Sequence, residues 1–277
     1  MAFATTASGV RIAYDDLGAG DGVPLLFTTG WCSSRARWRP VAERLSRGRR
    51  VLSSEWRGHG DSDPAPADFG LEEMIEDVLA VADAAGAERF VPCAASHSGF
   101  VAIELRRRHP ERVPMLVHAD WYVVPPPPPY RAVLEQLTTT DGWPAARDKL
   151  CEIWKAGVDD PEIDGALAVM KRHGEDMWMR SGREIGLGYE RVESPVAAWA
   201  ALDPPVPVLH VYGQPADPAF LTAQEEYAAQ NPWFTVRKLP GVTHFCMLET
   251  PAEVAGTIEA FLASEPLSDD PRSATDD

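Results

Sequence analysis

A short apolar run that breaks on small residues and passes straight into a helical pattern constrains this 277-residue chain most. Residues 90–94, Phe-Val-Pro-Cys-Ala, predict a buried strand. From His97 to Arg108 the pattern is helical, and Ser96 stands at the turn between the two. Because the turn is tight, the residues two before and two after the serine must be small. Here they are Ala94 and Ser98.

A serine at the apex of such a strand-to-helix turn is typical of the nucleophile elbow of the α/β-hydrolase fold. The backbone N–H groups that follow it, that of His97 first, lie at the positive end of the helix and can hold a developing oxyanion. A buried strand followed by a helix that Ser96 merely caps is the simpler alternative.

The remaining patterns predict a mostly parallel central sheet flanked by helices. Strands are expected at 10–14, 24–28, 50–54, 113–119, 206–212 and 234–239, and helices at 38–45, 71–85, 219–230 and 251–263. Strands that alternate with helices are typical of a parallel sheet covered on both faces. We therefore predict an α/β fold of the α/β-hydrolase class.

Five consecutive prolines at 125–129 interrupt this alternation, because proline continues neither a helix nor a central strand. From there to residue 195 only helical patterns occur, at 132–137, 144–156 and 166–173. These patterns predict a helical cap over the site. The expected organisation is a core of residues 1–125 and 196–263, a cap of residues 126–195 and a disordered acidic tail of residues 264–277.

Composition narrows the cellular setting and the partners. The net charge of −16 makes nucleic acid an unsuitable partner. The four cysteines have neither metal-ligand spacing nor a paired pattern, which suits a reducing cytoplasm. The first ten residues show no signal peptide, and no apolar run approaches the ~20 residues that span a bilayer. The sequence implies no protein partner.

Three residues have the chain order of a hydrolase triad. The elbow serine Ser96 is followed by an acid and then by His244, in a loop after the last predicted strand. A carboxylate on the second ring nitrogen would make that histidine a general base. Asp120, after the strand that follows the elbow helix, and Asp217, one strand later, compete for the role of the acid. Spacing alone does not choose between them.

Tryptophans adjoin these elements. The chain has nine, of which Trp31 follows the second strand, Trp121 follows Asp120 and Trp178 lies in the predicted cap. In the α/β-hydrolase fold the loop after that strand supplies the second oxyanion N–H, here that of Trp31. Several indoles around one base indicate a flat aromatic substrate held by stacking.

Short motifs along nearly the whole chain resemble one branch of the fold. They are Gly30-Trp31-Cys32, Trp56 to Gly60, Ser96-His97, Asp120-Trp121, Trp178 with Arg180 to Arg183, Asn231 to Phe234 and Thr243 to Phe245. The sequence is similar to the cofactor-independent 2,4-dioxygenases that open 3-hydroxy-4(1H)-quinolones and related N-heteroaromatic rings.

The resemblance implies an activity and roles for individual residues. In that family a His–Asp dyad, matched here by His244 and Asp120, removes the substrate's 3-hydroxyl proton, and dioxygen attacks the anion without metal or flavin. The expected products from a 2-alkyl substrate are carbon monoxide and an N-acylanthranilate. Ser96 would position the substrate, Trp31 would donate from its loop and Trp178 would shape the pocket.

Two positions depart from the family pattern. Some relatives carry histidine at the positions of Ser33, next to Cys32, and of Ala95, next to the elbow serine. In those relatives both positions touch the substrate, so the ring substituent stays open. The alternatives are a serine hydrolase of an ester, lactone or carbon–carbon bond that uses Ser96 as nucleophile, and a relative that binds its ligand without turnover.

Overall fold

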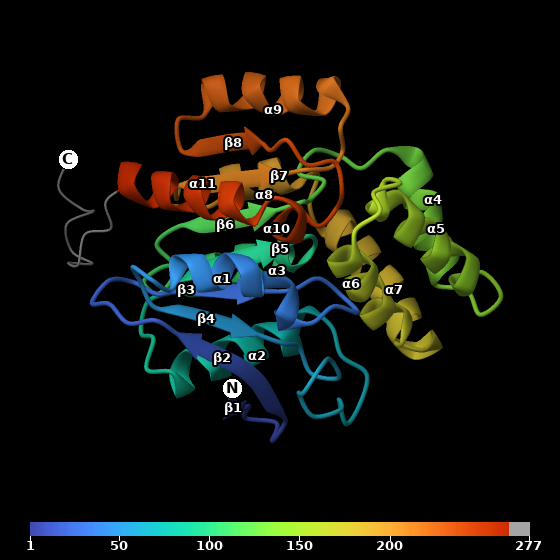
Figure 1. Cartoon of the computed structure of the whole chain (residues 1–277), viewed down its shortest axis with the longest axis horizontal. Coiled ribbons are helices and arrows are strands. Elements are labelled where there is room, and N and C mark those ends of the chain that lie inside the picture. The colour runs from blue at the N-terminus through green and yellow to red at the C-terminus, as the bar shows by residue number, and fades with distance from the viewer. Residues whose placement is uncertain (266–277) are drawn as a thin grey trace.

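The structure, a computed structural model, describes residues 1–265, and an eight-stranded sheet forms its centre (Figure 1). The strands are β1 (Ala2–Thr5), β2 (Arg11–Leu17), β3 (Leu25–Thr28), β4 (Val51–Ser54), β5 (Val91–Ala95), β6 (Leu116–Ala119), β7 (Val208–Tyr212) and β8 (Phe234–Lys238). Their order is β1-β2-β4-β3-β5-β6-β7-β8. The strand pairs from β4 to β8 are parallel, and β1 and β2 join antiparallel. The predicted mostly parallel α/β-hydrolase sheet is confirmed.

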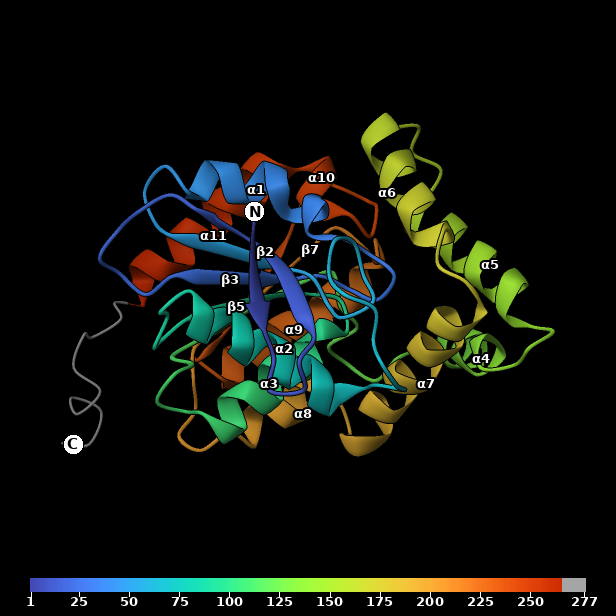
Figure 2. The same cartoon turned by 90° about the horizontal axis from the view of Figure 1, so that it is seen from below.

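Helices cover both faces of this sheet. The core helices are the 3-10 turn η1 (Arg35–Trp38), α1 (Arg39–Leu45), α2 (Leu71–Ala84), α3 (Ser98–Arg108), α8 (Pro195–Ala200), α9 (Pro218–Gln230), α10 (Cys246–Glu249) and α11 (Pro251–Ser264). Figure 2 shows α1 and α11 on one face, and α2 and α3 on the other. Every residue of β3 to β7 is buried, which explains why these strands are mostly apolar and do not alternate with exposed polar residues.

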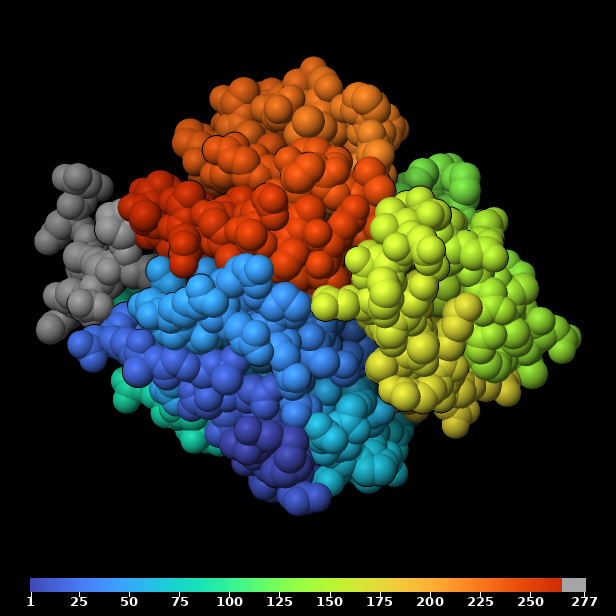
Figure 3. All heavy atoms as spheres, viewed as in Figure 1, coloured from blue at the N-terminus to red at the C-terminus, as the bar shows by residue number. Residues whose placement is uncertain are grey.

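Of the five helices between β6 and β7, the four that precede α8 lie within the range predicted for the cap and form a lobe beside the core (Figure 3). They are α4 (Pro128–Leu137), α5 (Trp143–Lys155), α6 (Pro161–Lys171) and α7 (Glu175–Arg191). The sequence patterns did not delimit α7, because its three glycines lower helix propensity. One of them is required for packing, since a Cβ on Gly182 would lie 2.6 Å from the Leu137 Cβ of α4. Of the predicted tail, only Ser264 and Glu265 lie within the described residues.

The cap is tied to the core by Asp68, in the loop before α2. Its carboxylate accepts from Arg180 Nε at 2.7 Å and pairs with Arg183 Nη1 at 2.8 Å, both on α7. The Arg180 guanidinium also lies 4.5 Å from the centre of the Phe69 ring. The two arginines of the Arg-Ser-Gly-Arg motif therefore hold the cap to the core through Asp68. Gly182, which lies between them, allows α7 to contact α4.

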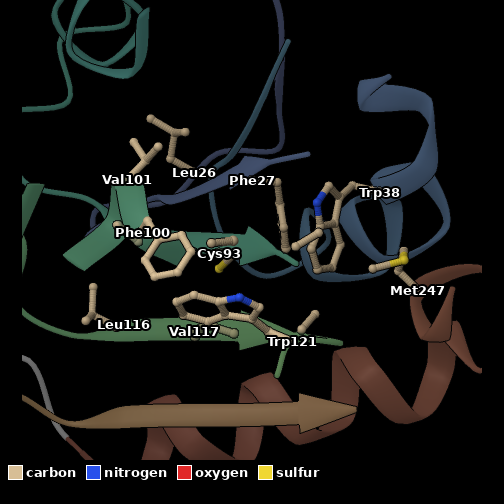
Figure 4. Packing of buried hydrophobic residues seen from close by; sticks show 14 of the residues in the cluster. Leu26, Phe27, Trp38, Cys93, Phe100, Val101, Leu116, Val117, Trp121 and Met247 are labelled. Atoms are coloured by element: carbon tan, nitrogen blue, oxygen red, sulfur yellow. The ribbon is translucent and has the colours of Figure 1, made fainter. Parts of the chain in front are cut away.

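The elbow helix is fitted closely around one tryptophan. A Cβ on Gly99 would lie 2.3 Å from the Trp121 ring, and the Phe100 and Trp121 rings meet edge to face with centroids 4.7 Å apart (Figure 4). Only glycine at this position lets α3 approach the turn after β6. The register that pairs Ala95 with Ala119, and Ala119 with Val211, then brings three strand ends to one edge of the sheet.

We expect Gly99→Ala to destabilise the protein by about 1–3 kcal/mol, because the added methyl overpacks against the Trp121 ring. Gly256→Ala in α11 is the matched control, since a Cβ there meets nothing within 4 Å. That change should stabilise by up to about 1 kcal/mol through helix propensity. Urea unfolding checks both, and equal shifts for the two variants would contradict the packing argument.

We expect Asp68→Asn to loosen the cap without unfolding the core. Hydrogen bonds from Arg183 and Arg180 lower the pKa of Asp68 to about 2. The tether is thus fully present above the unfolded pKa of about 3.9 and is lost only as pH falls through about 2. Amide hydrogen exchange of α7 at pH 7 should accelerate in the variant. Asp63→Asn, which removes a pair with Arg11 of the core, should leave α7 exchange unchanged.

Candidate active site

Three residues that follow the carboxyl ends of β3, β5 and β6 have left-handed backbone conformations. They are Cys32 (φ 59°), Ser96 (φ 56°) and Asp120 (φ 48°). Non-glycine residues adopt this conformation at a cost, and such strain gathers where a fold positions functional groups. The Ser96 amide donates to Ala119 O at 2.8 Å, and α3 begins two residues after the serine. The predicted elbow geometry is therefore present.

Asp120 is buried and held by three backbone amides. Oδ1 accepts from Gly213 N at 2.7 Å and from Gln214 N at 3.2 Å, and Oδ2 accepts from Cys246 N at 2.9 Å. Burial raises the pKa of Asp120, and these hydrogen bonds oppose the rise. The competing acid, Asp217, is exposed and caps α9 by accepting from Ala219 N at 2.9 Å.

His244, in the loop after β8, contacts the cap through both its ring and its backbone amide. Its ring stacks on the Trp154 indole of α5 with centroids 5.3 Å apart and planes 20° from parallel, and its amide donates to Trp154 O at 2.9 Å. The Trp178 indole of α7 lies nearly parallel to the Trp154 indole, with ring centroids 6.5 Å apart. Burial, with the nearby charge of Arg37, lowers the pKa of His244, so its imidazole is neutral at pH 7.

The predicted site residues gather around two small neighbouring cavities. One, of about 30 Å³, is lined by Ser96, Asp120, Trp121 and His244. The other, of about 20 Å³, is lined by Trp31, His97, Trp178 and again Ser96 and His244. Within residues 1–265, however, no hydrogen bond joins the His244 ring to Ser96 or to Asp120.

The expected room for a bicyclic ring is absent from this conformation. A cavity of about 10–15 Å³ holds a water molecule, whereas small-molecule sites offer about 300–1,000 Å³. Trp154 lines both cavities and covers His244, so the aromatic side chains of the cap fill the space instead. A bicyclic ring would fit here only if this tryptophan, or the cap that carries it, moved.

The imidazole of His97 bridges the elbow and the loop after β3. Its Nε2 accepts from the Trp31 amide at 3.2 Å, so the single proton of the neutral ring is on Nδ1, 3.3 Å from Ser96 Oγ. Burial lowers the pKa of His97 to about 3, which keeps the ring neutral. The Trp31 amide that was expected to face an oxyanion is occupied by this side chain.

The other predicted positions are buried but do not face the cavities. Cys32, Ser33 and Ala95 line neither of them. The Cys32 amide donates to His59 Nε2 at 2.9 Å, so His59, in the segment from Trp56 to Gly60, has an architectural role.

The sequence motifs do not identify two further residues of the site, Trp154 and Arg37. Trp154 lies outside every motif, and its only signal was helical periodicity. Arg37 is 4% exposed, although an arginine beside other arginines in a short helical segment usually points to solvent. Its Nη2 donates to His244 O, its Nε contacts Met247 Sδ at 3.2 Å, and it lines the smaller cavity.

Residues 1–265 contain no group of three or more His, Cys, Asp or Glu side chains arranged to hold a metal ion. No helix in that same range is long and apolar enough to cross a bilayer.

Comparison with known proteins confirms the resemblance. A family model described as the alpha/beta hydrolase fold matches residues 23–150. The chain is 33% identical to the 2-heptyl-3-hydroxy-4(1H)-quinolone dioxygenase of Mycobacteroides abscessus, over 93% of this chain and 97% of that protein. It is 30% identical to the 1H-3-hydroxy-4-oxoquinoline 2,4-dioxygenase of Pseudomonas putida, over 92% and 97%.

Solved structures show the same similarity. One of AqDC with its product, concerned with ring cleavage of the Pseudomonas quinolone signal, superimposes with a TM-score of 0.89 at 32% identity, over 95% of this chain and 100% of that one. A thermophilic esterase from Thermogutta terrifontis, at 21% identity and a TM-score of 0.74, shares the fold alone. The chain thus belongs to the 3-hydroxy-4-quinolone 2,4-dioxygenase family of the α/β-hydrolase fold.

Proposed function

We propose that this protein cleaves the heteroaromatic ring of a 2-alkyl-3-hydroxy-4(1H)-quinolone with dioxygen, releasing carbon monoxide and an N-acylanthranilate. Similarity over more than nine-tenths of the chain to dioxygenases of such rings carries the proposal. The gathering of Ser96, Asp120 and His244 under stacked indoles supports it.

His244 is the base in this proposal. Its neutral imidazole can accept the 3-hydroxyl proton, and its main chain is fixed between Trp154 O and the Arg37 guanidinium. Asp120 accepts from the amide of Cys246, two residues after His244, so the carboxylate is held against the short segment that carries the imidazole. We propose that the substrate ring displaces the Trp154 indole from the imidazole. The imidazole can then rotate toward Asp120.

Ser96 acts as a hydrogen-bond donor rather than a nucleophile. Because His97 Nδ1–H points to Ser96 Oγ, the serine uses a lone pair there, and its own proton remains available. That proton can reach an oxygen of a ring bound above His244. The serine thereby holds the substrate anion without forming a covalent bond.

The cap supplies an apolar surface for the ring substituent. Five aliphatic side chains of the cap line the smaller cavity: Leu134, Leu137, Leu150, Met170 and Ile185. They favour an alkyl group over a polar one and exclude water from the anion. Deprotonation lets the electron-rich ring pass one electron to triplet dioxygen. The protein therefore has to remove the proton, through His244, and to exclude water, through the apolar side chains of the cap. We infer that no metal or flavin takes part.

We further propose that the protein acts in the cytoplasm without a protein partner. Its four cysteines are buried free thiols, which suits a reducing compartment.

A serine hydrolase is the second candidate, because Ser96, His244 and Asp120 stand in triad order at an elbow. Acyl transfer needs a serine that gives its proton to the histidine and two N–H donors for the oxyanion. Here Ser96 Oγ contacts His97 instead, and the Trp31 amide is already engaged. The ground-state geometry therefore favours the dioxygenase.

We expect His244→Ala to lower kcat/KM for 2-heptyl-3-hydroxy-4(1H)-quinolone by about 10²–10⁴-fold, the usual contribution of a general base. Ser96→Ala should retain more of the rate, because it loses a hydrogen bond and no covalent step. Oxygen uptake with carbon monoxide detection checks both. A larger loss in Ser96→Ala than in His244→Ala would support the hydrolase reading.

His97→Ala should expose hydrolase chemistry that the wild-type protein lacks. Freeing the Trp31 amide restores an oxyanion donor, which is worth about 10²–10³-fold in acyl transfer. Hydrolysis of p-nitrophenyl acetate and fluorophosphonate labelling of Ser96 should therefore rise at least about tenfold. The double variant Ser96→Ala/His97→Ala is the control and should show neither gain. Wild-type protein that labels as fast as His97→Ala would contradict this reading.

A further inference from the structure

A buried cation stands beside the proposed base without a carboxylate of its own. Arg37 in η1 is 4% exposed, its Nη2 donates to His244 O, and its guanidinium lies 4.4 Å from the centre of the Phe245 ring. Across residues 1–265, no Asp or Glu oxygen comes within 4.0 Å of its nitrogens. Its polar contacts are a carbonyl and the sulfur of Met247.

The neighbouring Arg35, also buried, is accommodated differently. It pairs with Glu55 at 2.7 Å and with Asp15 and Asp61 at 3.0 Å. Burying a cation without such partners is costly. Burial lowers the pKa of Arg37 to about 10, so the group still carries its charge at pH 7. A charge retained at that cost, with no carboxylate paired to it, is free to stabilise an anion at the surface that it faces.

The surface that Arg37 faces is the smaller cavity, which it lines with Ser96, His97 and His244. Besides these two histidines, the titratable groups whose charge acts on it or on those rings are Asp120, Cys246 and His59, and burial lowers the pKa of His59 to about 3, so that ring is neutral too. Both histidines are neutral, and burial raises the pKa of Cys246 well above its usual value, so it stays a thiol. Asp120, of these, is the one anion, and three amides already engage it.

We propose that Arg37 is the counter-ion of the substrate oxyanion, an inference that rests on the proposed function. In the step it serves, the O–H bond of the 3-hydroxyl breaks, the electron pair stays on oxygen, and the proton passes to His244 and at equilibrium to solvent. The guanidinium stabilises the charged ring over the neutral one. The bound substrate therefore ionises at lower pH than the free one.

This role differs from that of His244. The histidine moves the proton, whereas the arginine sets how far ionisation proceeds at equilibrium. An opposite charge within about 4–6 Å favours the ionised form by about 10- to 1,000-fold. Lysine at the same position keeps the charge but concentrates it at the end of a flexible stem.

The test is an anaerobic absorbance titration of 3-hydroxy-2-methyl-4(1H)-quinolone bound to the protein, from pH 6 to 10. We expect the ionisation constant of the bound probe to exceed that of the free probe at least tenfold. Arg37→Met should reduce it at least tenfold, and Arg37→Lys should give an intermediate value. Arg39→Met is the matched control, since it removes the same charge from an exposed position two residues away and should leave the constant unchanged.

Each outcome has one meaning. Equal ionisation constants for the bound probe in wild type and Arg37→Met overturn the role of Arg37. If Arg37→Met does not fold, the wild-type comparison decides, and a bound constant no larger than the free one overturns the proposal. Binding with the expected shift but no oxygen uptake in air overturns the proposed function alone. Absence of binding to the wild-type protein overturns both.

Discussion

The stack of Trp154 on His244 is the contact on which the rest of the site depends. It joins a helix of the cap to the loop after the last strand, and a main-chain hydrogen bond between the same two residues reinforces it. Because the contact covers the imidazole, the cavities beside it stay small. In the proposed reaction, this contact shields the base until a flat ring takes the place of the indole.

The closed conformation has an electrostatic consequence. Burial keeps His97 and His244 neutral, while Arg37 keeps its charge. The site therefore places a buried positive charge beside neutral imidazoles, and its one carboxylate, Asp120, is already engaged by three backbone amides. Such a pocket favours an organic anion, the species that dioxygen attacks in the proposed reaction. An acyl transfer would instead need a Ser–His pair and a free oxyanion donor, and His97 engages the groups that both require.

The sequence predicted the parts of this arrangement that local chemistry determines. Small residues around Ser96 specify the elbow, and apolar runs specify the buried strands. Residues contributed by tertiary packing had no such signal. Trp154 lies in the site only because α5 packs over the loop that follows β8. Arg37 lies there only because η1 packs against α10. Helix α7 was missed because glycines that allow close helix packing also weaken helical periodicity. Asp120 and Asp217 look alike in sequence, and burial separates them.

The central claim is that deprotonation inside this aromatic pocket suffices for dioxygen to attack. Purified protein treated with a metal chelator, given 2-heptyl-3-hydroxy-4(1H)-quinolone in air, tests it most directly. The account predicts one dioxygen consumed and one carbon monoxide released for each ring opened. A chelated protein that binds the quinolone but consumes no dioxygen, and regains activity when a metal is added back, would contradict it.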